Sequence, residues 1–298
     1  MGILESLGKI LEKANQSSEK AIALLEYLQY FGYILKDEPS ISEVIVAIRR
    51  FQEQFGISET DIGAKTVRAM EWPRCAVKES LVQQAANPAR WGTNQISYFI
   101  RSRDTDLPQD LWDSCMKTGF DVWSAVTPLK FFKVDKQSEA NFVIDVGQGR
   151  ADDFDGPSGT LAWFQLVPQA GYRGQIFGKF DVGETWVADP KKRGIILTHV
   201  AAHEFGHGLG LMHSNKSSAL MAPFYSPSVG IPQPNDDISR IQALYGKNVA
   251  PTPTPVPVPQ PVPTPTPTPN PTSSKVVLEI NGRIDSITIP GYRITKMG

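Results

Sequence analysis

The strongest constraint on this chain is a fifteen-residue segment from His199 to His213, which reads HVAAHEFGHGLGLMH and holds all four histidines of the sequence. His203 and His207 are four residues apart, so on a helix both imidazoles project from one face toward one metal ion. Gly210 lacks a Cβ atom, which allows a sharp turn that returns His213 to the same ion. Three neutral imidazoles leave one position of a tetrahedral zinc open, as in catalytic sites.

The complete motif is more specific than its first half. H-E-x-x-H alone arises by chance, and its histidines then lie on an amphipathic helix that binds no metal. Here the pattern continues as H-E-x-x-H-x-x-G-x-x-H and is followed by Met221, which is the extended metzincin motif. The resemblance implies that Glu204 is the general base and that Met221 forms a Met-turn beneath the ligands. It also implies that His199 is not a ligand, which leaves it a role in packing or support.

Composition describes an ordinary globular protein. The chain has 298 residues, 41% hydrophobic content and a formal net charge of −1, so no electrostatic footprint for nucleic acid is present. No apolar run reaches the length of a membrane span, and the N-terminus has no signal-peptide core. Met1 and Gly2 fit the loose myristoylation pattern, although an apolar helix face is the favoured interpretation. Only Cys75 and Cys115 could pair, so no disulfide framework is expected, and Cys115 is interpreted as a small buried residue.

After an N-terminal extension of residues 1–17, residues 18–79 predict a three-helix unit. Apolar residues at helical spacing fill Ser18 to Ile34, and Ser40 with Glu43 has the capping-box spacing of a second helix. A third helix is expected from Ala64 to Met70, before Pro73. The order FGYILKDE, AIRRFQEQFGISETDIGAKTVRAM and PRC resembles the propeptide of matrixins, the matrix metalloproteinase family. The same unit is similar to peptidoglycan-binding modules, so cell-wall binding is an open alternative.

Cys75 lies in the segment PRCAV, and a thiolate is a strong zinc ligand that could occupy the open fourth position. The segment resembles the cysteine switch of matrixins, PRCGVPD, with Ala76, Lys78 and Glu79 replacing glycine, proline and aspartate. The resemblance implies an inhibitory thiolate and a latent enzyme, with Glu79 still able to pair with Arg74. The alternative is a lone cysteine without a regulatory role.

A catalytic domain is predicted over residues 91–246, after a connector of residues 80–90. QISYFIR, LKFFKV and ANFVIDV alternate like strands, and LPQDLWDSCMKTGFDVWSAV has helical period. We therefore expect an α+β protein. DVWSAVTPLKFFKV is similar to matrixin sequence, and the likeness runs from about residue 18 to 246. It implies a metzincin-type mixed five-stranded sheet with long helices, preceded by the three-helix prodomain.

A loop rich in glycine and carboxylates follows, GRADDFDGPSGTLAWFQLVPQAGYRGQIFGKFDVGETWV. Oxygen ligands in such a loop suit calcium, and a solvated acidic loop is the alternative. The matrixin resemblance implies one calcium site. Its side-chain ligands would come from Asp155, Asp181 and Glu184, and its backbone carbonyl ligands from Gly156, Ser158 and Thr160. Matrixins hold a second, structural zinc nearby, but this chain has Gln148, Arg150, Trp163 and Lys179 at those positions. None is a good zinc ligand, so we expect a single zinc, with the loop held by calcium, by packing or by a salt bridge from Lys179 or Arg150.

The resemblance also implies a substrate-binding edge. Thr160 to Gln165 lies where the matrixin sheet offers its edge strand, with Leu161 and Ala162 at positions whose backbone pairs with the peptide. An edge strand binds an extended chain through main-chain hydrogen bonds, and a sheet edge that binds no substrate is the alternative. Pro223 and Tyr225 match the wall of the pocket that receives the side chain after the scissile bond.

Beyond residue 246 the composition changes. Prolines occupy every odd position from 251 to 271, so residues 247–275 form a Pro/Thr linker that favours polyproline II. Residues 276–298 alternate around Asn281-Gly282, which predicts a short β segment too small to bury its own core. Such spacers are common in exported proteins, so secretion is expected.

Together these features predict a latent zinc endopeptidase of the matrixin type. His203, His207 and His213 bind Zn²⁺, Glu204 moves the proton from a water to the leaving amine, and Cys75 blocks the site. Expected partners are protein or peptide substrates, without nucleic acid, and the chain is expected to be a monomer. The alternative is a wall- or matrix-binding protein, attached through the N-terminal unit or the C-terminal tail, whose zinc site is vestigial.

Overall fold

The computed structural model describes residues 18–59, 62–79 and 89–248. The predicted N-terminal extension, the Pro/Thr linker and the C-terminal β segment, together with most of the connector, lie outside these residues. The described residues of the helical unit and of the predicted catalytic region belong to one compact unit.

The N-terminal unit contains three helices, as predicted: α2 (Ser18–Tyr30), α3 (Ile41–Gln54) and α4 (Ala64–Met70). The capping box at the start of α3 is present, because the Ser40 side chain accepts from the Glu43 backbone N–H and the Glu43 side chain accepts from the Ser40 backbone. The apolar faces of α2 and α3 meet in a small core in which Leu28 and Phe51 are fully buried.

The main sheet has six strands in the order β1-β6-β8-β5-β3-β4, one more than the predicted five. Five of them belong to the predicted catalytic domain: β3 (Gln95–Ile100), β4 (Lys130–Lys133), β5 (Phe142–Gly147), β6 (Thr160–Phe164) and β8 (Ile176–Asp181). All neighbouring strands are parallel except β6 and β8. The sixth strand is β1 (Arg74–Cys75), which runs parallel to β6. The predicted five-stranded sheet is therefore present in the catalytic region, and β1 adds a sixth strand because the open edge of β6 pairs with the segment around Cys75.

Short elements complete the structure. They are β2 (Arg90–Trp91), which pairs with β7 (Ala170–Tyr172), β9 (Trp186–Val187), which pairs with β10 (Ile195–Ile196), the 3₁₀ turns η1 (Gln137–Glu139) and η2 (Arg150–Asp152), and the π-helical turn η3 (Pro234–Ile238). The closing helix α7 (Ser239–Tyr245) follows η3 directly.

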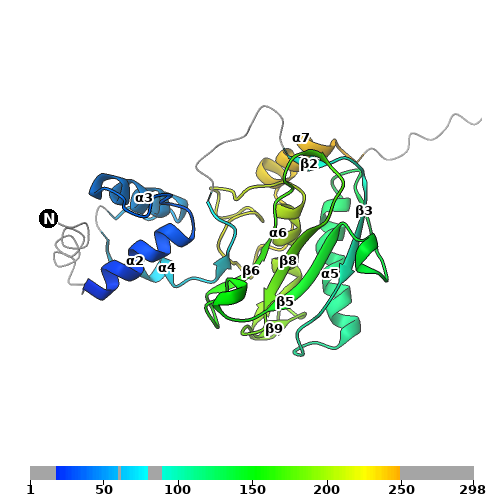
Figure 1. Ribbon diagram of the computed structural model, residues 1–298, viewed down its shortest axis with the longest axis horizontal. Helices are drawn as coiled ribbons and strands as arrows, with labels where there is room; N and C mark the ends of the chain where they lie inside the picture. The colour runs from blue at the N-terminus through cyan, green and yellow to red at the C-terminus, as the bar shows by residue number, and fades with distance from the viewer. Residues whose placement is uncertain (1–17, 60–61, 80–88, 249–298) are drawn as a thin grey trace, which may run out of the picture. The chain divides into compact units, whose positions relative to one another are not determined.

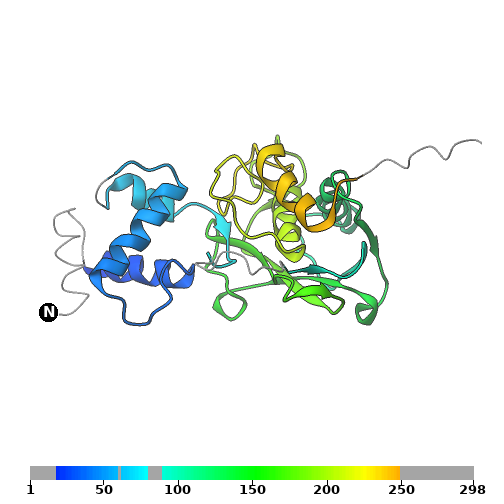
Figure 2. The same cartoon turned by 90° about the horizontal axis from the view of Figure 1, so that it is seen from above.

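Two long helices, α5 (Gln109–Ser124) and α6 (Leu197–Gly208), lie side by side and cover one face of the sheet (Figures 1 and 2). Their contact is aromatic and hydrogen-bonded. Phe120 of α5 stacks on Phe205 of α6 with ring centroids 3.7 Å apart, and the indole of Trp123 donates to the Ala202 carbonyl at 2.9 Å. These contacts fix the position of α6, which carries most of the histidine motif. Cys115 is buried on α5, as predicted.

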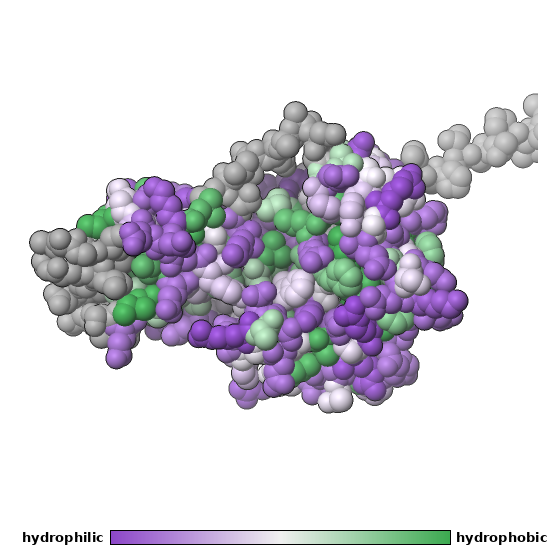
Figure 3. Space-filling model, viewed as in Figure 1, coloured by the Kyte–Doolittle hydropathy of each residue, from purple (hydrophilic) through white to green (hydrophobic). Residues whose placement is uncertain are grey.

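The visible surface is mostly hydrophilic, with apolar side chains in small patches (Figure 3). None of the helices in the described part of the chain combines the length and apolar character that a membrane crossing needs. Isolated exposed apolar residues such as Leu35 and Ile231 are normal for a folded domain.

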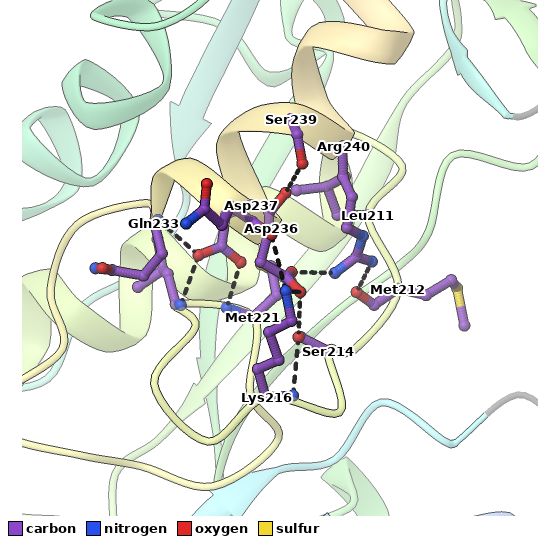
Figure 4. A network of polar contacts seen from close by, with 12 residues as sticks. Leu211, Met212, Ser214, Lys216, Met221, Gln233, Asp236, Asp237, Ser239 and Arg240 are labelled. Atoms are coloured by element: carbon purple, nitrogen blue, oxygen red, sulfur yellow. Dashed lines mark hydrogen bonds and ion pairs between the residues drawn. The ribbon is translucent and has the colours of Figure 1, made fainter.

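A buried carboxylate joins η3 to the turn that contains Met221 (Figure 4). Asp237 is 0% exposed and accepts hydrogen bonds from the backbone N–H groups of Leu220, Met221 and Gln233 at 2.8, 3.0 and 2.8 Å. Hydrogen bonds from N–H groups to a carboxylate are among the strong ones in proteins. Asp237 therefore holds the Met221 turn in place beneath the histidines.

Replacing Asp237 by asparagine tests this role. The Asp237→Asn side chain points an N–H at a backbone N–H, and such an unsatisfied buried group costs about 1–3 kcal/mol. We expect the thermal midpoint to fall by several degrees, measured by circular dichroism, whereas Asp135→Asn at an exposed position should leave it unchanged. An unchanged midpoint for Asp237→Asn would contradict the assigned role.

Candidate metal centre

The histidine motif is shaped by the way α6 ends. After the C-cap Leu209, the Gly210 N–H donates to the His207 carbonyl at 2.8 Å and the Leu211 N–H donates to the Gly206 carbonyl at 3.0 Å. This is the bond pattern of a Schellman motif. Gly210 has a φ of +100°, and a Cβ there would lie 2.4 Å from the Ala89 carbonyl oxygen, so only glycine fits without strain. The predicted turn is present and brings the following residues back toward the helix.

The structure brings the four predicted zinc ligands together. Ligand atoms of Cys75, His203, His207 and His213 all lie within 4.8 Å of one another, and no other group of three or more His, Cys, Asp or Glu among the described residues meets this criterion. Cys75 is 5% exposed, His203 7% and His207 0%. These residues, 138 positions apart from first to last in sequence, therefore form one buried cluster.

Hydrogen bonds to carbonyl oxygens fix which ring nitrogen His203 and His207 each turn toward the cluster. His203 Nδ1 lies 2.7 Å from the Leu220 carbonyl oxygen, and His207 Nδ1 lies 2.7 Å from that of Leu211. Because a carbonyl only accepts, both Nδ1 atoms carry the proton, and both Nε2 atoms present lone pairs. The two Nε2 atoms lie 3.2 Å apart. Two facing lone pairs repel unless a cation lies between them, so this geometry fits a metal ion.

The charges around the cluster fit a cation equally well. Glu204 is 0% exposed and neither carboxylate oxygen has an aligned hydrogen-bond partner, and burial raises its pKa to about 8. Burial, with the neighbouring Glu204 carboxylate, also raises the pKa of the Cys75 thiol well above its usual value. Burial lowers the pKa of His203 to about 3 and that of His207 well below its usual value, which keeps both rings neutral. Neutral imidazoles and a thiol that a divalent cation would ionise are the donor set that zinc binds.

Met221, the predicted Met-turn residue, packs against α6. It is 0% exposed, and a Cβ at Gly206 of α6 would come within 2.3 Å of its sulfur. The missing side chain at Gly206 therefore makes room for Met221 directly against the metal-binding helix. Sequence reasoning explained Gly210 but gave no role to Gly206.

The predicted substrate-binding residues line a channel that the strand β1 fills. On one side, the Arg74 N–H donates to the Gly159 carbonyl at 2.9 Å and the Ala76 N–H donates to the Ala162 carbonyl at 3.0 Å. On the other side, the Cys75 N–H donates to the Pro223 carbonyl at 3.0 Å, and the Tyr225 N–H donates to the Pro73 carbonyl at 2.8 Å. An extended segment thus lies between the β6 edge and the segment from Pro223 to Tyr225.

A cavity opens beside the metal centre. Leu161, Pro223 and Tyr225, all predicted to bind substrate, contribute to its lining, together with Glu204. His199 lines the same cavity, a position that the sequence assigned only to packing or support. Four residues before His203 on α6, it lies one helical turn from the ligands and outside their cluster.

The acidic calcium candidates occupy two neighbouring loops. Glu184 accepts from the Ser158 N–H at 2.7 Å and Asp155 accepts from the Thr160 N–H at 2.7 Å, which links the two loops. Burial raises the pKa of Glu184 to about 7, and the charges of Asp181 and Asp155 raise it further. The hydrogen bond from Ser158 acts in the opposite direction and is outweighed. The buried Asp181 Oδ2 and Thr160 Oγ1 have no hydrogen-bond partner. Repelling carboxylates with unpaired oxygens suit a cation, although their oxygens are less tightly clustered than the zinc ligands. Gly156 belongs to the same loop and has a φ of +98°.

Lys179, one of the four positions that the matrixin resemblance aligns with structural-zinc ligands, forms an ion pair here. Lys179 pairs with Asp152, and the Trp163 indole donates to the Asp152 carbonyl at 2.9 Å. The Gln148 N–H donates to Asp152 Oδ2 at 2.9 Å. A salt bridge from Lys179, one of the alternatives left open for this loop, is therefore present. Its partner Asp152 was not identified from the sequence, because nothing in the local pattern distinguishes it from the adjacent Asp153. Arg150 begins η2 beside this cluster.

The zinc content of purified variants distinguishes the predicted ligand His207 from its neighbour His199 on the same helix. We expect His207→Ala to lose the bound zinc, because one of four clustered donors is removed. His199→Ala is the matched control, since it changes the same residue type on the same helix, and it should retain one zinc per chain. Metal analysis of the purified chains by mass spectrometry gives the result; equal zinc in both variants would contradict the assignment.

Comparison with known proteins gives a family match and several similar relatives. Residues 90–246 match the family model of the matrixins. The chain is 35% identical over 251 residues to interstitial collagenase of Equus caballus, which covers 80% of this chain and 52% of that protein. It is 34% identical over 235 residues to stromelysin-2 of Rattus norvegicus, covering 74% and 48%, and 35% identical over 265 residues to matrix metalloproteinase-C of Caenorhabditis elegans, covering 78% and 44%. The chain thus spans about half the length of the curated relatives it matches. With more than half of its residues in the family match and the metal-binding geometry of its histidines, the chain belongs to the matrixin family.

Proposed function

We propose that this chain is the latent form of a zinc-dependent endopeptidase. The observation that carries the proposal is the meeting of three histidines, a cysteine and an unpaired buried glutamate at the edge of a sheet. Zinc bound by His203, His207 and His213 would polarise a scissile carbonyl and lower the pKa of a water. The collagenase, stromelysin and metalloproteinase names of the relatives support a protein substrate.

The chain's own residues supply the rest of the chemistry. Glu204, which is buried next to the ligand histidines, takes a proton from the attacking water and delivers it to the leaving amine nitrogen. The backbone of Leu161 and Ala162 and the segment from Pro223 to Tyr225 hold the substrate in extended form. β1 already lies between these two segments, so the channel accepts an extended main chain.

Latency follows from the position of Cys75. Its sulfur lies among the histidine ligand atoms, and β1 fills the channel that the substrate needs. We assign residues 18–79 to an inhibitory propeptide, residues 91–246 to the catalytic domain and residues 247–275 to a linker. Removal of the propeptide frees both the coordination position and the sheet edge. A protease of this kind acts outside the cell, so we also propose secretion.

The mechanism predicts a clear result for Glu204→Ala. This variant should bind one zinc, because Glu204 is not among the clustered ligands, and should lose at least about 100-fold in peptide cleavage, the range of general-base catalysis. Both chains are compared after removal of the propeptide, on a generic unfolded protein with and without a zinc chelator. Cleavage by the mutant at the wild-type rate would overturn the mechanism, and a zinc-loaded wild type that cleaves nothing would favour a wall- or matrix-binding protein.

Latency is tested by Cys75→Ser in the full-length chain. A serine hydroxyl is a far weaker zinc ligand than a thiolate, so we expect the uncleaved variant to hydrolyse peptide faster than the uncleaved wild type. Cys115→Ser, which changes the other buried cysteine, should stay latent. A full-length wild type that is already fully active would show that Cys75 does not inhibit.

We further propose one calcium site formed by Asp155, Asp181 and Glu184, with backbone oxygens of Gly156, Ser158 and Thr160. A ligand that binds the folded state at 100 times its Kd stabilises it by about 2.7 kcal/mol, which is several degrees in a chain of this size. Calcium should therefore raise the thermal midpoint of the wild type and much less that of Asp181→Asn. Asp189→Asn at an exposed position is the control. An equal rise in all three proteins would place the calcium elsewhere.

A further inference from the structure

The third zinc ligand differs from the other two in the partner of its Nδ1 atom. His203 and His207 point Nδ1 at main-chain carbonyls of the catalytic region. Nδ1 of His213 instead lies 3.1 Å from Oε1 of Glu79. Glu79 belongs to the proposed propeptide, residues 18–79, which is called the pro-segment from here on. The contact is at ion-pair distance, and the ring N–H is not aligned for a straight hydrogen bond. With Nδ1 facing Glu79, Nε2 is the nitrogen of His213 that remains for the metal.

Glu79 is held rigidly by the rest of the pro-segment. Arg74 donates to Oε1 at 2.7 Å, Gln54 donates to Oε2 at 3.4 Å, and the Glu79 backbone N–H donates to the Phe31 carbonyl at 2.7 Å. The Glu79 side chain is only 11% exposed. Its carboxylate is therefore positioned by contacts that do not involve the metal centre.

Arg74, the main partner of Glu79, is itself fixed between the two domains. It is 1% exposed, with its guanidinium carbon 3.7 Å from the ring centroid of Phe31 and 4.6 Å from that of Phe224. Phe31 belongs to the pro-segment and Phe224 follows Pro223 in the catalytic region. Such cation–π contacts are strong when the cation is desolvated. Docking of the pro-segment thus sets the position of Arg74, which sets that of Glu79.

We propose that Glu79 is a positioning residue for His213, so that the pro-segment strengthens zinc binding through an outer-shell carboxylate in addition to blocking the site with Cys75. A carboxylate at Nδ1 orients a metal-ligating imidazole and raises its basicity, and loss of such a partner costs about 10–100-fold in metal affinity. By linkage, zinc in turn strengthens docking of the pro-segment, and both effects disappear when residues 18–79 are removed. This inference rests on the proposed zinc centre.

The test measures zinc release from the full-length chain. Every sample carries Glu204→Ala to prevent self-cleavage, and zinc transfer to an excess of a chromophoric chelator is followed with time. Glu79→Gln should release zinc about 10–100-fold faster than the unaltered chain. Glu79→Asp keeps a carboxylate near Arg74 but is one methylene too short to contact His213, so it should also release zinc fast. Lys78→Gln, at the exposed neighbouring position, is the control and should match the unaltered chain.

A second measurement shows whether the pro-segment stays docked. In the cobalt-substituted chains, the charge-transfer band of a bound thiolate reports Cys75 coordination, and it should persist in both Glu79 variants. Unchanged release in Glu79→Gln overturns the proposal, as does fast release in Glu79→Gln with normal release in Glu79→Asp, because the effect would then pass through Arg74 alone. Fast release only where the thiolate band is lost also overturns it. Failure of every chain to bind zinc would instead overturn the proposed function, and the inference with it.

Discussion

The candidate metal centre brings buried nitrogen, sulfur and oxygen atoms close together, and a bound cation would relieve the repulsion among their lone pairs. His203 and His207 point the lone pairs of their Nε2 atoms at each other across 3.2 Å, and Glu204 has two buried oxygens without an aligned partner. Unpaired buried polar groups cost free energy, and these are held in place by the stacked helices α5 and α6 and by the turn that Asp237 fixes. The fold therefore stores the metal-binding geometry in advance, and zinc binding would stabilise it.

In the proposed function, the same sheet edge would serve both substrate binding and latency. An edge strand offers unpaired N–H and C=O groups that bind any extended chain, and in this structure β1 occupies that edge. The backbone pairing aligns Cys75 with Ala162 of β6 and carries its sulfur to the histidines. The proposed inhibition would thus use one set of main-chain hydrogen bonds for position and one side chain for coordination. Cleavage of a connector beyond residue 79 would release both.

Local patterns in the sequence predicted much of this arrangement. The spacing of His203 and His207, Gly210 before His213, and the capping box at Ser40 each depend on contacts within a few residues, and the structure contains all three features. The roles of Glu204 and of the calcium candidates came from family resemblance, and they stay predictions. The α+β class could be predicted because helical and strand periods alternate along the chain.

Features that depend on long-range contacts could not be predicted. The sixth strand, β1, is only two residues long, so it has no periodic signal that could have predicted it. It forms because β6 offers it an edge to pair with. The contact of Glu79 with His213 joins residues 134 positions apart, and no local pattern indicates it. Asp152 and Lys179 meet because η2 folds back onto β8, which a single sequence does not reveal.

The central claim is that a cysteine of the pro-segment shares one zinc with three histidines. X-ray absorption at the zinc edge of the full-length chain measures this directly. The account predicts one sulfur at about 2.3 Å and three nitrogens at about 2.0–2.1 Å, with the sulfur replaced by oxygen after removal of the pro-segment. A first shell without sulfur in the full-length, zinc-loaded chain would contradict it.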